Sequence, residues 1–290
     1  MIRSVQTHTK RILTTLPAIL TFAVLFGLVL YNFVIQVLTN AVVREASQMN
    51  DPMRMLTLSE ESSMTLSRED GLNFYSLANT YLLLLYPALV SFPVCSLWIS
   101  DRGSGMVNYF DARSGRRAFW FGKLIAVFLS TFVIFTLPFL LEIMLGIFSF
   151  PASAKGSPGT DYLRTIQDES LYFMPVLLGK STVLYAVVMT LLFGLVSGIF
   201  GCFTYACSTL PFMRFRVLNF LPVIVLLYGG ILLQGVFFRG TQLTYLVLMK
   251  MFFPQTGGKY PIPLYAGILA GLLLISAGII FLRSGKDELS

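Results

Sequence analysis

Six long apolar runs constrain this chain more than any other feature of its sequence. A helical run of about 20 apolar residues matches the thickness of the hydrocarbon core of a bilayer. Inside that core every backbone polar group must be paired within the protein, so a helix is expected for each run. The runs lie at about residues 14–38, 77–99, 120–147, 180–208, 217–237 and 262–282. We therefore expect an all-α membrane protein built as a six-transmembrane-helix bundle.

The composition agrees with a single membrane domain over residues 1–290. Hydrophobic residues make up 56% of the chain and charged residues only 12%, whereas soluble domains carry about 25% charged residues. The formal net charge is +7, which in a soluble protein would suggest nucleic acid as a partner. Here the cations gather at the ends of the apolar runs, and no Lys/Arg tract is long enough to follow a phosphate backbone. We expect no nucleic-acid partner and a lipid bilayer as the surroundings.

The distribution of cations predicts which loops face the cytoplasm. Six spans place both termini on the same side as segments 1–12, 101–123, 210–217 and 283–290. These segments hold 12 of the 21 Lys and Arg residues, although their total length is well below that of the other loops. The other loops hold nine of the fourteen acids. By the positive-inside rule, both termini are expected in the cytoplasm of a multi-pass protein of the cell membrane.

The sequence offers no residues for catalysis, for a cofactor or for a metal. A phosphate-binding P-loop needs GxxxxGK[ST], but Met174 stands where Gly179-Lys180-Ser181 would require the first glycine. The single histidine, His8, has no partner cluster. The three cysteines lie within apolar runs and are expected to be buried small side chains. We expect no enzyme activity in this chain.

Glu142 is the only acid within a predicted span. An intramembrane carboxylate is by default a functional hypothesis. Glu142 lies about 22 residues into the third span, which is about 33 Å along a helix and close to the outer headgroups. Two interpretations stay open: the side chain snorkels toward those headgroups, or it contributes to a translocation path.

Two short segments outside the spans also have a predicted role. Residues 1–12 carry Arg3, Lys10 and Arg11, and they favour either an amphipathic helix on the inner surface or a disordered leader. Residues 241–253 are apolar but short, which suits a re-entrant or interfacial helix on the outer face.

The short basic loop at residues 101–123 is the strongest functional candidate. Ser104 can cap a short helix, with Met106, Tyr109 and Phe110 on one face. The cations of the loop are Arg102, Arg113, Arg116, Arg117 and Lys123. From composition alone, these cations either bind anionic lipid and set the topology, or the loop docks a cytosolic partner.

The loop resembles the inner loop of type-2 ATP-binding-cassette (ABC) exporter permeases. That family shows an acidic–basic pair, then a glycine in a small turn, then an arginine before a Gly-Lys that opens the third helix. The matching residues here are Asp101-Arg102, Gly105-Met106, Arg116 and Gly122-Lys123. Two departures are Asp101, where Glu is usual, and Arg113, where a proline often stands. The order of elements is similar over nearly the whole chain: an N-terminal surface (elbow) helix, a long outer loop after the first span, and a short extracellular helix between spans five and six.

The resemblance implies a permease subunit that pairs with a second permease subunit, identical or different. Separate cytosolic ABC ATPase subunits would bind the ATP and Mg²⁺ and drive export. The inner loop would form the coupling helix that sits in a groove of the ATPase. In that role Arg102, Arg116 and Arg117 carry polar contacts, while Met106, Tyr109 and Phe110 anchor the helix to the spans.

The few fixed charges along the spans favour an amphipathic substrate, such as a lipid-like compound, a peptide or a drug. The alternative is a stand-alone membrane protein, either a secondary carrier or a scaffold or assembly factor. A secondary carrier usually needs ionisable groups near the middle of the bilayer, and the sequence places none there.

Overall fold

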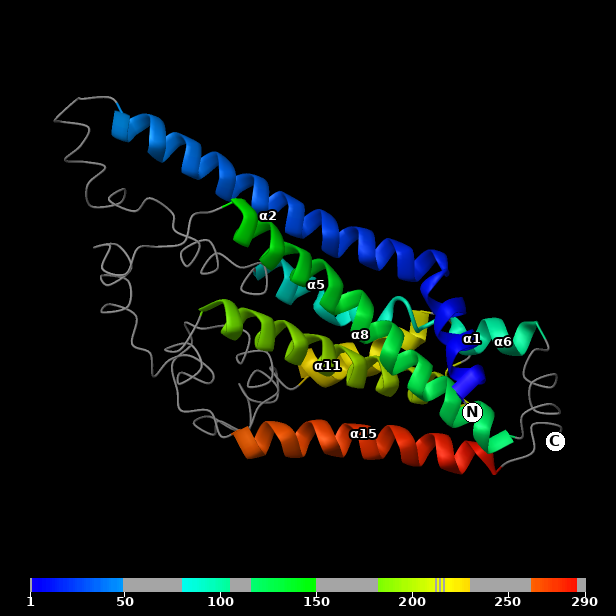
Figure 1. Ribbon diagram of the computed structural model, residues 1–290. Helices are drawn as coiled ribbons and strands as arrows, with labels where there is room; N and C mark the ends of the chain where they lie inside the picture. The colour runs from blue at the N-terminus through cyan, green and yellow to red at the C-terminus, as the bar shows by residue number, and fades with distance from the viewer. Residues whose placement is uncertain are drawn as a thin grey trace.

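The computed structural model describes residues 2–48, 80–104, 116–149, 182–211, 213, 215, 217–229 and 262–285, and every regular element among them is helical. Figure 1 shows the long helices running side by side, with short helices around them. In chain order the elements are α1 (Ile2–Leu13), α2 (Leu16–Gln48), α5 (Thr80–Ser91), α6 (Leu97–Gly103), α8 (Arg116–Ser149), α11 (Thr182–Ser208), η3 (Val217–Phe220), α12 (Leu221–Ile224), η4 (Val225–Gly229) and α15 (Ile262–Ser284).

Four of the predicted spans are present as continuous helices that are long and apolar enough to cross a membrane. They are the first, third, fourth and sixth spans, within α2, α8, α11 and α15. The apolar stretches are Leu16–Ile35, Ala118–Ser149, Val183–Ser208 and Tyr265–Ser284. The chain is therefore described as a membrane protein with an all-α fold, and the six-span arrangement remains a prediction.

The predicted second span is not one continuous helix. It divides into α5 and α6, and the residues between them form turns rather than helix. Pro93 stands in this break, and a proline has no backbone N–H to donate to the preceding helical turn. One carbonyl of the break has a partner from a distant part of the chain, because the Asn219 side-chain nitrogen donates a hydrogen bond of 2.6 Å to the carbonyl of Cys95.

The predicted fifth span begins with three short consecutive elements instead of one regular helix. η3 is a 3₁₀ helix, α12 is a single α-helical turn and η4 is a π-helix. The Tyr228 hydroxyl donates to the carbonyl of Leu84 on α5 across 2.5 Å. The remainder of that predicted span, and the predicted outer helix at 241–253, lie outside the described residues.

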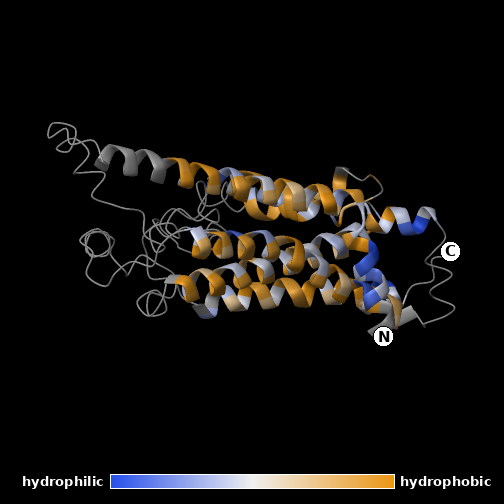
Figure 2. Ribbon diagram, turned by 45° about the horizontal axis from the view of Figure 1, so that its top comes forward, coloured by the Kyte–Doolittle hydropathy of each residue, from blue (hydrophilic) through white to orange (hydrophobic). Residues whose placement is uncertain are grey.

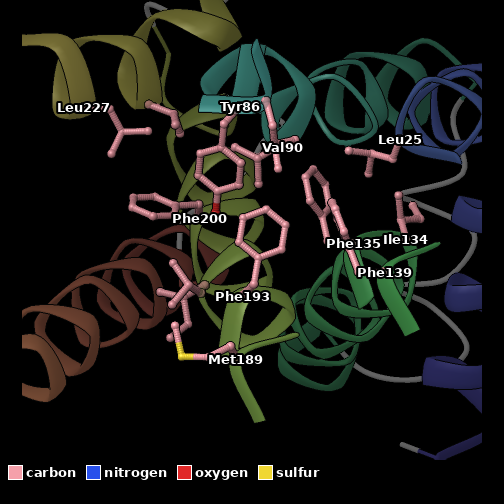
Figure 3. Close-up of a cluster of buried hydrophobic side chains, with 14 of the residues drawn as sticks. Leu25, Tyr86, Val90, Ile134, Phe135, Phe139, Met189, Phe193, Phe200 and Leu227 are labelled. Atoms are coloured by element: carbon pink, nitrogen blue, oxygen red, sulfur yellow. The ribbon is translucent and has the colours of Figure 1, made fainter. Parts of the chain in front are cut away.

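Aromatic side chains fill the centre of the bundle, where α5, α8 and α11 meet. Tyr86 on α5 lies edge-on to Phe135 on α8, with ring centroids 5.9 Å apart, and against Phe193 on α11 at 5.3 Å. Its hydroxyl lies 3.0 Å from the hydroxyl of Ser197. Figure 3 shows these rings pointing toward one another, with Leu25 of α2 and Leu227 of η4 in the same cluster. One apolar core therefore joins the five elements.

Glycines on α11 allow that helix to lie directly against α8. A Cβ at Gly198 would lie 2.8 Å from the ring of Phe128, and one at Gly201 would lie 2.7 Å from the Thr131 hydroxyl. Gly194 is similarly closed off by Thr136. Small residues let helix backbones approach closely in membranes. The three glycines therefore serve the packing of α11 against α8 within the chain.

Polar residues gather at one end of the bundle. Figure 2 shows hydrophilic residues on α1 and on the far turn of α6, while the long helices are mainly hydrophobic. The start of α8 and the end of α15 lie at the same end (Figure 1). Contacts join these elements there, because Ile280 of α15 and Ile12 of α1 belong to one buried cluster.

Candidate functional site

A group of three charged residues, two of them buried, joins the elements at this polar end. The carboxylate of Asp101 pairs with the guanidinium of Arg11, at 2.9 Å between Nη1 and Oδ1, and with the ammonium of Lys123. Asp101 is 4% exposed and Lys123 is 2% exposed. We call Arg11, Asp101 and Lys123 the ion cluster. It holds two cations for one carboxylate, and it connects α1, α6 and α8.

Each member is placed by its own helix. Asp101 lies near the end of the seven-residue α6, whose other buried residues are Leu97 and Trp98. Lys123 lies in the second turn of α8. Arg11 lies in the last turn of α1, where a cation also interacts favourably with the carbonyl end of the helix. The acid and the Lys that border the predicted inner loop are thus brought together by the fold.

Aromatic rings surround the cations of the cluster. The ammonium of Lys123 lies 5.8 Å from the ring centroid of Phe119 and 5.3 Å from that of Tyr205 on α11. These distances suit cation–π attraction, which is stronger where water is excluded. The two tryptophans of the chain, Trp98 and Trp120, lie beside each other with ring centroids 4.8 Å apart. The ion cluster is therefore set in a packed apolar layer.

His8 on α1 lies at the edge of this layer. Its ring meets that of Phe119 edge-on at 5.5 Å, and the residue is buried. Burial, together with the nearby charges of Lys123 and Arg11, lowers the pKa of His8 from 6.5 to about 4. Neutral imidazole is therefore the form that the fold accepts.

The other predicted residues of the inner loop have different positions. Arg102 is exposed in the last turn of α6, and Ser104 is the C-cap of that helix, donating from its hydroxyl to the carbonyl of Asp101 at 3.2 Å. Ser104 therefore ends α6, whereas the sequence suggested that it begins the next helix. Arg116 and Arg117 are the first two residues of α8. Gly105, Met106, Tyr109, Phe110 and Arg113 lie outside the described residues.

The ion cluster joins three helices through its charges. Removing one partner of a buried ion pair strongly destabilises the folded protein, because the other charge is left in a poorly solvating environment. The Asp101–Lys123 contact joins the two ends of the predicted inner loop, residues 101–123. The Arg11–Asp101 contact joins the first of these ends to α1. Three helices are thus coupled at one carboxylate.

Glu142 occupies a second polar position, on the face of α8 that meets α2. It is 6% exposed, and its Oε1 accepts a hydrogen bond of 3.3 Å from the amide nitrogen of Asn32 on α2. The carboxylate therefore lies between two helices of the bundle, and both interpretations of Glu142 stay predictions. The contact also assigns a partner to Asn32, which sequence reasoning had not paired with any residue.

Sequence reasoning also missed the part that α1 plays in the site. Arg11 was interpreted only as a topology signal, and His8 as an isolated residue. One available signal was the four-residue spacing of His8 and Ile12, which places both side chains on one face of a helix. Both residues are buried in the structure. The pairing of Arg11 with Asp101 spans some 90 positions in the chain, and no local pattern predicts it.

Comparison of the chain with protein-family models, with curated proteins and with solved structures gave no match in any of the three.

Proposed function

We propose that this chain is the permease subunit of an ATP-driven ABC exporter. It forms six transmembrane helices with both termini in the cytoplasm, and it builds the translocation path together with a second permease subunit. Separate cytosolic ATPase subunits supply the energy through the loop between α6 and α8. The substrate is amphipathic, because the four described spans are apolar and carry few charged side chains.

The observation that carries this proposal is the buried Asp101–Lys123 contact. It holds the two ends of the inner loop together, so a push on the loop is transmitted to α6 and α8 at the same time. A long flexible linker would absorb such a push. Packed interiors transmit displacement because they have few voids and low compressibility. The ion cluster thus supports a role for the loop in receiving force.

The division of the second span supports the same mechanism. α6 is separated from α5 by the turn that contains Pro93, and Asn219 holds this turn through the Cys95 carbonyl. A short helix next to a break can change its angle without distorting the longer helices. A movement received at the loop can therefore tilt α6 before it reaches the central core around Tyr86.

The exposed faces of α2 and α15 offer room for a second permease subunit. Both helices carry many exposed large apolar side chains, and Gly267 and Gly271 of α15 have no atom within 4 Å of a Cβ built on them. Such faces meet lipid or another helix in a membrane.

The test is co-purification of the chain with a cytosolic ABC ATPase, which is first sought in the neighbouring reading frames. Wild type is compared with a double charge reversal, Arg116→Glu with Arg117→Glu. The matched control is Arg214→Glu with Arg216→Glu, which reverses two cations of the neighbouring predicted inner segment. We expect the loop variant to lose the ATPase and the control to retain it.

Two results would overturn the proposal. The first is unchanged complex formation and unchanged stimulation of ATP hydrolysis in the loop variant, which would remove these arginines from the docking surface. The second is transport by the purified chain alone without nucleotide, which would favour the stand-alone carrier.

A further inference from the structure

We propose that the exposed side of α1, together with the start of α2, binds the headgroup of an anionic phospholipid. A shallow pocket of about 480 Å³ that is open to its surroundings, here called the cavity, lies on this face and is lined by Gln6, Thr7, Lys10, Arg11 and Thr14. This site does not depend on the ATPase. It assigns a ligand to a helix that the proposed function treats only as a surface element.

The lining of the cavity suits a phosphate group. Lys10 is exposed and Arg11 is partly exposed, so two cations in the last turn of α1 can approach the same anion. The hydroxyl of Thr14 donates to the carbonyls of Lys10 and Arg11 at 3.1 and 3.0 Å. It thereby shields the carbonyl end of the helix, which would otherwise oppose an anion.

Arg11 can serve both the phosphate and the ion cluster. Its contact with Asp101 is made through Nη1, and the same side chain lines the cavity. A phosphate bound in the cavity would therefore meet a guanidinium already oriented by a buried carboxylate. Orientation in advance lowers the conformational entropy lost on binding.

The exposed apolar residues that follow Thr14 in the sequence favour a lipid as the ligand. Two positions beyond Thr14, the apolar span of α2 begins with Leu16, which is 71% exposed. Ile19 and Leu20 continue this exposed apolar face. An anionic lipid presents a phosphate followed by acyl chains, which matches a cationic cavity followed by an apolar helix face. An acidic peptide or free phosphate would use the cations but leave the apolar face uncovered.

The experiment measures the lipid retained by the purified full-length chain in detergent, by native mass spectrometry. Phosphatidylglycerol and phosphatidylcholine of identical acyl chains are added in separate samples, and inorganic phosphate is added as a competitor. The test variant is Lys10→Gln, and Lys10→Arg retains the charge. The matched control is Arg102→Gln, which removes an exposed cation from the same end of the bundle but not from the cavity.

We expect wild type and Lys10→Arg to retain phosphatidylglycerol in preference to phosphatidylcholine. Lys10→Gln should weaken retention about fivefold, the effect of one cation near an anionic lipid surface, and Arg102→Gln should leave it unchanged. Equal retention of the two lipids, or equal losses in Lys10→Gln and Arg102→Gln, would overturn the site. Displacement of the lipid by inorganic phosphate would show a phosphate site and overturn the assignment to lipid.

Discussion

Arg11 in the last turn of α1 pairs with Asp101 near the end of α6, with 2.9 Å between the guanidinium and the carboxylate. Lys123 pairs with the other oxygen of the same carboxylate. Because one acid serves two cations, the N-terminal helix and the two ends of the inner loop are bound to a common point. The following predictions begin from this relationship.

Replacing Asp101 by Asn should destabilise the bundle. The change leaves Lys123 and Arg11 without their carboxylate, and breaking a buried ion pair in this way costs about 3–5 kcal/mol. The measurement is unfolding of the full chain in detergent micelles, followed by the fluorescence of Trp98 and Trp120, which lie in the apolar layer around the cluster. Arg102→Gln, one position along the chain and exposed, should keep the wild-type midpoint. A wild-type midpoint for Asp101→Asn would show that the ion cluster contributes nothing to stability.

A double variant should be less destabilised than the sum of its single changes. Asp101→Leu combined with Lys123→Met replaces the buried pair by apolar side chains, and such replacements are often neutral or stabilising. Asp101→Leu alone leaves the buried Lys123 without its carboxylate, whereas Lys123→Met alone leaves Asp101 with Arg11 as its remaining partner. A double-mutant cycle on the unfolding free energy measures the coupling, which we expect to be about 1–3 kcal/mol. Strict additivity would mean that Asp101 and Lys123 do not interact.

Stability should fall on acidification because of His8. Its pKa is about 4 in the folded chain against an ordinary value of 6.5, so the unfolded state binds more protons between these two pH values. The contribution of His8 is complete above pH 6.5 and is lost as the pH falls toward 4. At about 1.36 kcal/mol per pKa unit, the loss is at most about 3 kcal/mol. Unfolding midpoints measured from pH 7 to pH 4 should show it.

His8→Phe should remove this pH dependence while keeping an aromatic ring against Phe119. Its unfolding midpoint should change less than that of wild type across the same interval. If both chains responded equally to acidification, the pH dependence would belong to another group.

A larger side chain at Gly198 should separate α11 from α8. A Cβ at this position would already lie 2.8 Å from the ring of Phe128, and overpacking typically costs about 1–3 kcal/mol. The matched control is Gly267→Val on α15, where nothing lies within 4 Å of the added Cβ. The unfolding midpoint should fall for Gly198→Val and stay close to wild type for Gly267→Val. Equal effects would indicate that intrinsic helix propensity, rather than helix packing, governs both positions.

Removing the amide of Asn32 should weaken the contact between α2 and α8. Asn32→Leu deletes the donor to Glu142, and interhelical hydrogen bonds in membranes contribute about 0.6 kcal/mol on average. We expect a loss of that size in the unfolding free energy. Glu142→Gln should lose less, because a carboxamide oxygen can still accept from Asn32. A larger loss for Glu142→Gln than for Asn32→Leu would contradict this contact.

Length and hydropathy alone predict the four continuous spans, because each apolar run must pair its own backbone groups wherever water is absent. They do not identify Asn219 as the residue that donates to the Cys95 carbonyl in the break near Pro93. The sequence also does not predict that the second span breaks near Pro93. A proline shows where a helix can end, but the packing of neighbouring helices decides whether the helix continues through it.

The candidate site was decided largely by the tertiary structure. The sequence alone determined that Asp101 and Lys123 border a basic inner loop, since both stand at the ends of apolar runs. It assigned them to that loop, whereas the fold buries them together and adds Arg11 from a distant helix. The physical reason is that a charge enters a protein interior only with a partner, and the partner is chosen by how the helices pack, not by spacing along the chain.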